Sequence, residues 1–243
     1  MTSSPNLVAL QFQYANRSFE NNFETLSILV ENSPQNSIIL APELCLSGYD
    51  YENLEKNTQL AKDFMPKIKA LSEDKIFSLT IAEEKDGHYF NNVKIFHNKE
   101  EIYSRAKARL FSLGNEEKYF TSGKDEDIKI VQIDGVKIAI LLCFELRYIE
   151  LWEKAKGADI ILIPAYWAKK RKLHLEALSK AVAIMNQCFV IIANSSDEDM
   201  ASSAGIINPF GEAKRDDSSG SIIDKFDLSM IKKMRRYINI GLT

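Results

Sequence analysis

The sequence lacks a long apolar run and a clustered set of cysteines. No apolar stretch approaches the roughly 18 residues of a membrane-spanning helix, and residues 1–6 carry no basic segment followed by an apolar one, as a secretory leader would. Cys45, Cys143 and Cys188 are odd in number and widely spaced, with no CxxC pair, which argues against a disulfide framework and a zinc site. We therefore expect a cytoplasmic protein without a membrane partner.

An excess of one charge and the common nucleotide motifs are also absent. The 31 basic and 34 acidic residues are interspersed and give a formal net charge of -3, so no electrostatic footprint for nucleic acid is visible. Neither GxGxxG nor GxxxxGK occurs, and His88 and His97 have no metal-ligand spacing such as HExxH. We expect no nucleic-acid partner, no metal and no cofactor.

The chain has enough length and apolar residues for one large domain. It has 243 residues, of which 45% are hydrophobic, and residues 1–243 are interpreted as a single domain. Short apolar runs, interpreted as buried strands, alternate with segments of helical period at 18–31, 56–71, 146–156, 172–187 and 227–237. Residues 86–107 have the turns and extended segments of a β-hairpin or meander. This pattern predicts an α/β fold of two packed mixed sheets with helices outside.

Cys143 ends the most apolar predicted strand, residues 136–142. The carboxyl ends of buried parallel strands open into crevices where a side chain can meet a ligand. A free cysteine more often packs as a small hydrophobic side chain, and this alternative stays open for Cys143.

Glu43 and Lys107, like Cys143, lie at the ends of predicted extended segments. Glu43 follows the predicted strand 37–41 and precedes the apolar run LCLSGY, which favours a buried carboxylate. Lys107 closes the meander, and Arg105, Lys107 and Arg109 share one face if the strand continues. The alternatives are a solvated acid at a strand end and a solvated lysine.

The segments around these residues resemble the Glu-Lys-Cys motifs of the nitrilase-related carbon-nitrogen hydrolases. The matching segments are APELCLSGY around Glu43, YSRAKARLF around Lys107 and LLCFELRYIELW around Cys143, followed by ILIPAYW, NQCFVIIAN and INPFGE in the family's order. The resemblance spans nearly the whole chain. It implies a four-layer αββα sandwich of two mixed β-sheets and pairing with a second copy as a homodimer or larger assembly.

The resemblance also implies roles for these residues. Cys143 would attack an amide carbonyl while Glu43 accepts its proton. Lys107 and the backbone N–H of Phe144 would hold the oxyanion, and water would release the acid from a thioester on Cys143. A second acid, Glu116 rather than Glu117, would hold Lys107, although both could be surface acids at the start of a short helix.

Four further residues follow from their positions. Tyr166 and Trp167 follow a strand end, so we expect one to line the substrate pocket and the other to cover the core. His174, at the start of the long helix, could meet a substrate carboxylate or remain at the surface. Arg147 is expected to pair with an acid and brace the loop after Cys143.

The sequence thus predicts a hydrolase that cleaves a non-peptide C–N bond of a small linear amide or N-carbamoyl compound, and releases ammonia or an amine. The motif order is most similar to the omega-amidase-like and N-carbamoyl amidohydrolase-like branches. Two alternatives stay open. One is a catalytically silent dimeric binding or scaffold relative, and the other is an acyltransferase that uses the same thioester.

Overall fold

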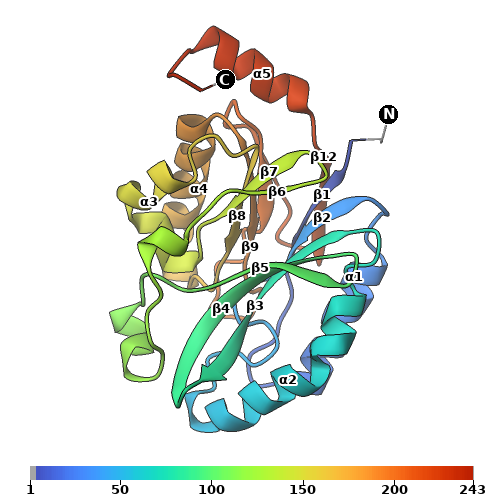
Figure 1. Ribbon diagram of the computed structural model, residues 1–243, viewed down its shortest axis with the longest axis vertical. Coiled ribbons are helices and arrows are strands. Elements are labelled where there is room, and N and C mark those ends of the chain that lie inside the picture. Colours follow the sequence, from blue (N-terminus) through green and yellow to red (C-terminus); the bar gives the residue numbers. More distant parts are fainter. Residues whose placement is uncertain (1–3, 243) are drawn as a thin grey trace.

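The computed structural model describes residues 4–242, so residues 1–3 and Thr243 of the expected single domain lie outside it. Two six-stranded sheets pack face to face, with helices on their outer faces (Figure 1). The predicted αββα sandwich is confirmed.

Each sheet combines parallel and antiparallel pairs. The first sheet has the order β12 (Ser221–Lys225), β1 (Asn6–Leu10), β2 (Ser37–Leu40), β3 (Ile76–Lys85), β4 (His88–His97) and β5 (Glu100–Ala106). The second has the order β11 (Ala213–Arg215), β10 (Gly205–Ile207), β9 (Phe189–Ala193), β8 (Ile160–Pro164), β7 (Val136–Ile140) and β6 (Val131–Ile133). The strands β1, β2 and β3 are parallel, as are β7, β8 and β9.

Within residues 4–242, five α-helices lie outside the two sheets. They are α1 (Phe19–Glu31), α2 (Leu54–Ala70), α3 (Ile149–Lys154), α4 (Lys172–Asn186) and α5 (Leu228–Tyr237). The helices α1 and α2 cover the first sheet, α3 and α4 cover the second, and α5 lies at the end of the molecule near the C-terminus (Figure 1). The side chain of Ser18 starts α1 by accepting a hydrogen bond from the backbone N–H of Asn21.

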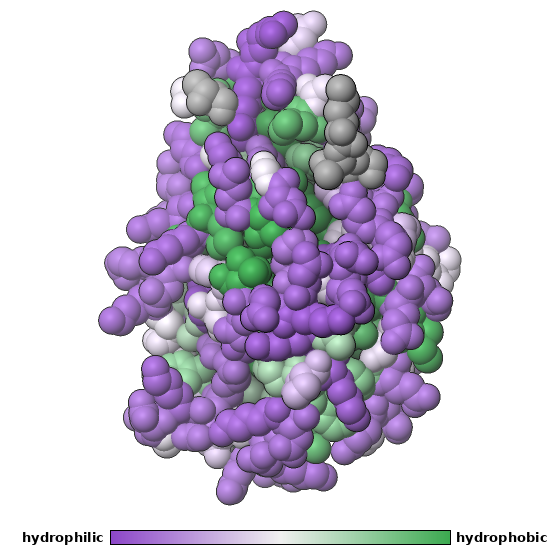
Figure 2. All heavy atoms as spheres, turned by 45° about the vertical axis from the view of Figure 1, so that its right-hand side comes forward, coloured by the Kyte–Doolittle hydropathy of each residue, from purple (hydrophilic) through white to green (hydrophobic). Residues whose placement is uncertain are grey.

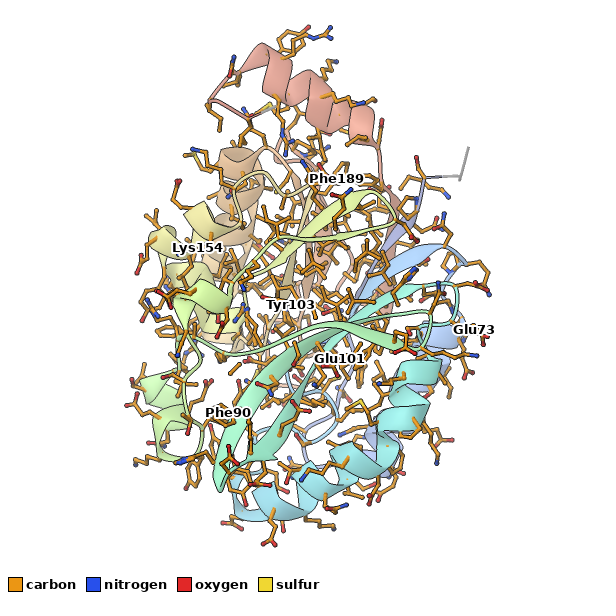
Figure 3. The ribbon with its side chains drawn as sticks, viewed as in Figure 1. Glu73, Phe90, Glu101, Tyr103, Lys154 and Phe189 are labelled. Atoms are coloured by element: carbon orange, nitrogen blue, oxygen red, sulfur yellow. The ribbon has the colours of Figure 1, made fainter. Side chains whose placement is uncertain are left out.

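The inner strands β1, β2, β8 and β9 are almost wholly apolar, because both faces of each sheet are buried there. In β1, Leu7 and Ala9 pack toward the second sheet, whereas Val8 and Leu10 belong to the cluster beneath α1 and α2. Side chains fill the space between the two sheets, and Lys154 of α3 lies on the outer side (Figure 3).

Two local predictions were wrong. The expected helix 146–156 is a short 3-10 turn, Cys143–Arg147, followed by α3, because the extended backbone of Tyr148 separates them. The strand through Lys107 ends at Ala106, so Arg105, Lys107 and Arg109 do not share one face.

The face shown in Figure 2 is largely hydrophilic, with hydrophobic atoms gathered in its upper half. Within residues 4–242, no helix is long and apolar enough to cross a bilayer.

Candidate active site

The ends of three strands meet at one edge of the sandwich. β5 runs in the same direction as β2, so Glu43 and Lys107 follow strands that end at the same edge of the first sheet. Cys143 follows β7 of the second sheet. The backbone N–H of Glu43 donates to the carbonyl of Ala165, just beyond β8, at 3.2 Å. This hydrogen bond joins the loop after β2 of the first sheet to the loop after β8 of the second.

A buried charge cluster occupies this edge. The Nζ of Lys107 lies 2.8 Å from Oε1 of Glu43 and 2.8 Å from Oε1 of Glu116. Asn91 donates its side-chain amide to Oε1 of Glu43 at 2.9 Å, and the hydroxyl of Tyr49 donates to Oε1 of Glu116 at 3.0 Å. Lys107 is therefore held between two carboxylates, and neither Glu43 nor Glu116 is a surface acid.

Charge and burial act in opposite directions on Lys107 and Glu116. Burial alone would lower the pKa of Lys107, but the negative charges of Glu43 and Glu116 outweigh it and raise that pKa, so the ammonium stays protonated. Burial raises the pKa of Glu116, and Lys107 opposes that rise. Lys107 thus keeps its positive charge at a fully buried position.

Cys143 lies beside this cluster in a strained backbone conformation. Its φ of 48° falls in the left-handed region, which costs a non-glycine residue on the order of 1 to 3 kcal/mol. Burial, followed by the charge of Glu43, raises the pKa of the Cys143 thiol well above its usual value, and Lys107 opposes this. The thiol therefore stays protonated at neutral pH, and attack by the sulfur requires a neighbouring base.

The other two cysteines pack as hydrophobic side chains. Cys45 and Cys188 are fully buried in apolar clusters. Burial raises the pKa of each thiol, so both stay protonated. Neither pKa is influenced by a carboxylate and an ammonium together, as that of Cys143 is.

A cavity of about 20 Å³ opens beside Cys143. Its lining residues come from the loops beyond β5, β7 and β8: Phe111, Cys143, Phe144, Arg147, Tyr166, Trp167 and Arg171. Trp167 is 3% exposed and so contributes to both cavity and core. His174 is exposed and does not line the cavity; its Nδ1 lies 3.1 Å from Nη2 of Arg147.

The prediction that Arg147 pairs with an acid was wrong. Its guanidinium carbon lies 4.5 Å from the ring centroid of Trp167, and no ion pair to it is found within residues 4–242. Glu145 pairs instead with Arg105, at 2.6 Å.

The family model of the carbon-nitrogen hydrolases matches residues 7–236. The chain belongs to this family.

Two relatives of this carbon-nitrogen hydrolase are named amidases. A 2-oxoglutaramate amidase from Bacillus subtilis is 28% identical over 245 residues, which cover 95% of this chain and 94% of the relative. An omega-amidase from Escherichia coli is 27% identical over 184 residues, 72% of this chain and 70% of the relative.

A solved structure shows the same fold. A CN-hydrolase superfamily protein from Xanthomonas campestris superposes with a TM-score of 0.86 at 17% identity, over 98% of this chain and 96% of that chain. This similarity supports the αββα sandwich.

A buried anchor was missed by the sequence interpretation of this hydrolase. The carboxylate of Glu145 accepts hydrogen bonds from both terminal guanidinium nitrogens of Arg105, at 2.8 and 2.6 Å. It also accepts hydrogen bonds from the backbone N–H groups of Ala108 and Leu142, both at 2.7 Å. One side chain therefore joins the residue after Lys107 to the residue before Cys143.

Replacement of Glu145 by glutamine is expected to destabilise the fold by about 3 to 5 kcal/mol, because it leaves the buried guanidinium of Arg105 without a counter-charge. Equilibrium unfolding in denaturant measures the change. Glu150→Gln, at an exposed acid of α3, is the matched control and should shift the free energy of unfolding by less than about 0.5 kcal/mol. Equal shifts in the two variants would contradict the anchor.

Asn91, Tyr49, Phe111 and Arg171 were missed as well. Asn91 of β4 contacts Glu43, and Tyr49 of the loop after β2 contacts Glu116. Both pairs are far apart in the sequence, and only the tertiary structure brings them together. Arg171 carried a local signal, because it lies in the basic run KKRK, residues 169–172, soon after Trp167.

Proposed function

We propose that this carbon-nitrogen hydrolase is an amidase that cleaves the C–N bond of a small linear amide through a thioester on Cys143. The observation that carries the proposal is the buried contact of Lys107 with both Glu43 and Glu116, beside a thiol whose pKa responds to all three groups. A thiol that is protonated at rest needs an adjacent proton acceptor, and Glu43 supplies it.

In the first step, Sγ of Cys143 forms a bond with the amide carbonyl carbon while its proton passes to Glu43. The carbonyl π electrons move to the oxygen, which becomes an oxyanion. The ammonium of Lys107 and the backbone N–H of Phe144 stabilise this charge, and one such donor is typically worth about 3 to 4 kcal/mol.

In the second step, the tetrahedral intermediate collapses and its C–N bond breaks. Glu43 returns its proton to the leaving nitrogen, which departs as ammonia or an amine, and the thioester remains. Glu43 then takes a proton from water, whose oxygen attacks the thioester carbon. The C–S bond breaks, the carboxylic acid leaves, and Cys143 recovers its proton.

The names of two relatives support an amide substrate. The relatives from Bacillus subtilis and Escherichia coli are named amidases, which favours an amide over a nitrile. An N-carbamoyl compound presents the same carbonyl and leaving nitrogen, and is the second substrate class to test. A silent scaffold would gain nothing from a desolvated cluster of two carboxylates and one ammonium, which is costly to bury.

The purified protein is expected to release ammonia, in equal amounts with acid, from members of a panel of small linear amides and ureido acids. Mass spectrometry of protein quenched during turnover should find the acyl group on the peptide that contains Cys143. If a folded protein released no ammonia from any member, the proposal would be wrong. If an added amine captured the acyl group in preference to water, the thioester would serve acyl transfer instead.

A further inference from the structure

The two oxygens of the Glu43 carboxylate have different surroundings. Oε1 accepts two hydrogen bonds, from Nζ of Lys107 at 2.8 Å and from the side-chain amide of Asn91 at 2.9 Å. Oε2 is buried and has no hydrogen-bond partner among residues 4–242. Buried acceptors are almost always paired, so an unpaired one beside the reactive thiol points to a role in the chemistry. Oε2 is therefore the oxygen that is available to take a proton.

Asn91 is fixed by its strand. It lies in β4 and is fully buried, and its side chain shares a face of the strand with Val93, which packs between the two sheets. Its backbone carbonyl accepts a hydrogen bond from the backbone N–H of Lys107 at 2.8 Å. Because a carboxylate only accepts hydrogen bonds, the amide nitrogen of Asn91 must be the atom that faces Glu43. One residue thus holds the backbone of Lys107 and the carboxylate of Glu43.

Lys107 alone cannot fix the orientation of this carboxylate. Its ammonium is shared with Glu116, also at 2.8 Å, and a single donor would let the carboxylate of Glu43 turn about its last bond. The backbone of Glu43 is already held, because its N–H donates to the carbonyl of Ala165 at 3.2 Å and its carbonyl accepts the hydroxyl of Tyr14 at 2.7 Å. A second donor on Oε1 therefore determines where Oε2 points.

We propose that Asn91 is a positioning residue for the reaction, and that it directs Oε2 of Glu43 toward the thiol of Cys143. This inference rests on the proposed amidase function and deepens it. In the first step, the proton of Sγ passes to Oε2 while Sγ bonds to the amide carbon and the carbonyl π electrons move to the oxygen. The same proton leaves Oε2 for the departing nitrogen when the C–N bond breaks. Oε1 stays bound to Lys107 and Asn91 and carries no proton.

The first test is a double-mutant cycle between Asn91 and Glu43. Asn91→Leu removes the donor and keeps a similar volume. For the best amide of the panel, kcat should fall by about 10- to 100-fold with KM within about 3-fold, because a misplacement of about 1 Å costs about 10²-fold. In a Glu43→Gln background the same replacement should change kcat by less than about 3-fold, because the base that it positions is already gone. Asn91→Ala removes the same donor with a smaller side chain and should follow this pattern, and circular dichroism reports folding.

The matched control is Asn92→Leu. Asn92 is the next residue of β4, and its side-chain amide donates to Glu83, a carboxylate outside the buried cluster. This variant should keep kcat within about 3-fold of the wild type. Alkylation of Cys143 by iodoacetamide at neutral pH gives a readout that needs no amide. Its rate should fall by about 10-fold in Asn91→Leu, where Glu43 is misplaced, and should be unchanged in Asn92→Leu.

Two results would overturn the role of Asn91 while the amidase function stands. One is a wild-type kcat in Asn91→Leu. The other is an equal loss of kcat from Asn91→Leu in the wild-type and Glu43→Gln backgrounds, since Asn91 would then act independently of Glu43. If the folded wild-type protein hydrolysed no amide, the amidase function would fall, and an unchanged alkylation rate in Asn91→Leu would overturn the positioning role as well.

Discussion

Ammonia release should fall by about 10⁴-fold or more in Cys143→Ala, because no other group in the buried cluster can form the covalent intermediate. Glu43 and Lys107 remain in the variant, so their charges and the oxyanion contacts stay, and only the bond-forming sulfur is removed. The measurement is kcat with the best amide of the panel. Cys188→Ala is the control, since that thiol is fully buried in the apolar core and should leave kcat within about 3-fold.

Alkylation tests the reactivity of the same sulfur independently of turnover. Iodoacetamide should modify Cys143, which lines a cavity, before Cys45 and Cys188, which are fully buried in apolar clusters. Ammonia release by Cys143→Ala at the wild-type rate, or equal alkylation of all three thiols, would remove Cys143 from the mechanism.

A loss of about 10²- to 10⁴-fold in kcat is expected for Glu43→Gln, the usual contribution of a positioned general base. Glutamine keeps the size of the side chain and can still accept a hydrogen bond from Lys107, but it cannot take the proton of Cys143. The remaining activity should rise with pH, because burial keeps the Cys143 pKa high and only solvent base can then form the thiolate.

The control for this variant is Glu117→Gln, which changes an exposed acid next to the buried Glu116. Its kcat and its pH profile should match those of the wild type. If Glu43→Gln kept full activity, or if its remaining activity did not increase in alkaline solution, another group would have to accept the proton.

Much of the fold could be predicted because its signals are local. Apolar runs such as 136–142 and 37–41 mark strands buried on both faces, and they placed Cys143 and Glu43 correctly just beyond strand ends. The motif resemblance then indicated that Lys107 belongs with them, and the structure brings these side chains together.

The interactions that support the site could not be predicted, because they join residues far apart in the chain. Arg105 of β5 and Glu145 of the 3-10 turn after β7 are 40 positions apart, and no periodicity relates them. Arg147 was expected to pair with an acid and brace the loop after Cys143, but its side chain is exposed. Its stacking on Trp167 depends on how the loops after β7 and β8 meet, which is a property of the tertiary structure.

The proton acceptor and the sulfur belong to different layers of the sandwich, since Glu43 follows β2 of one sheet and Cys143 follows β7 of the other. A partially folded chain with both sheets formed but not docked would therefore hold every reactive group and remain inert. Chemical competence therefore requires the two layers to be docked, and a loosened interlayer contact would separate the carboxylate of Glu43 from the thiol even with every strand intact.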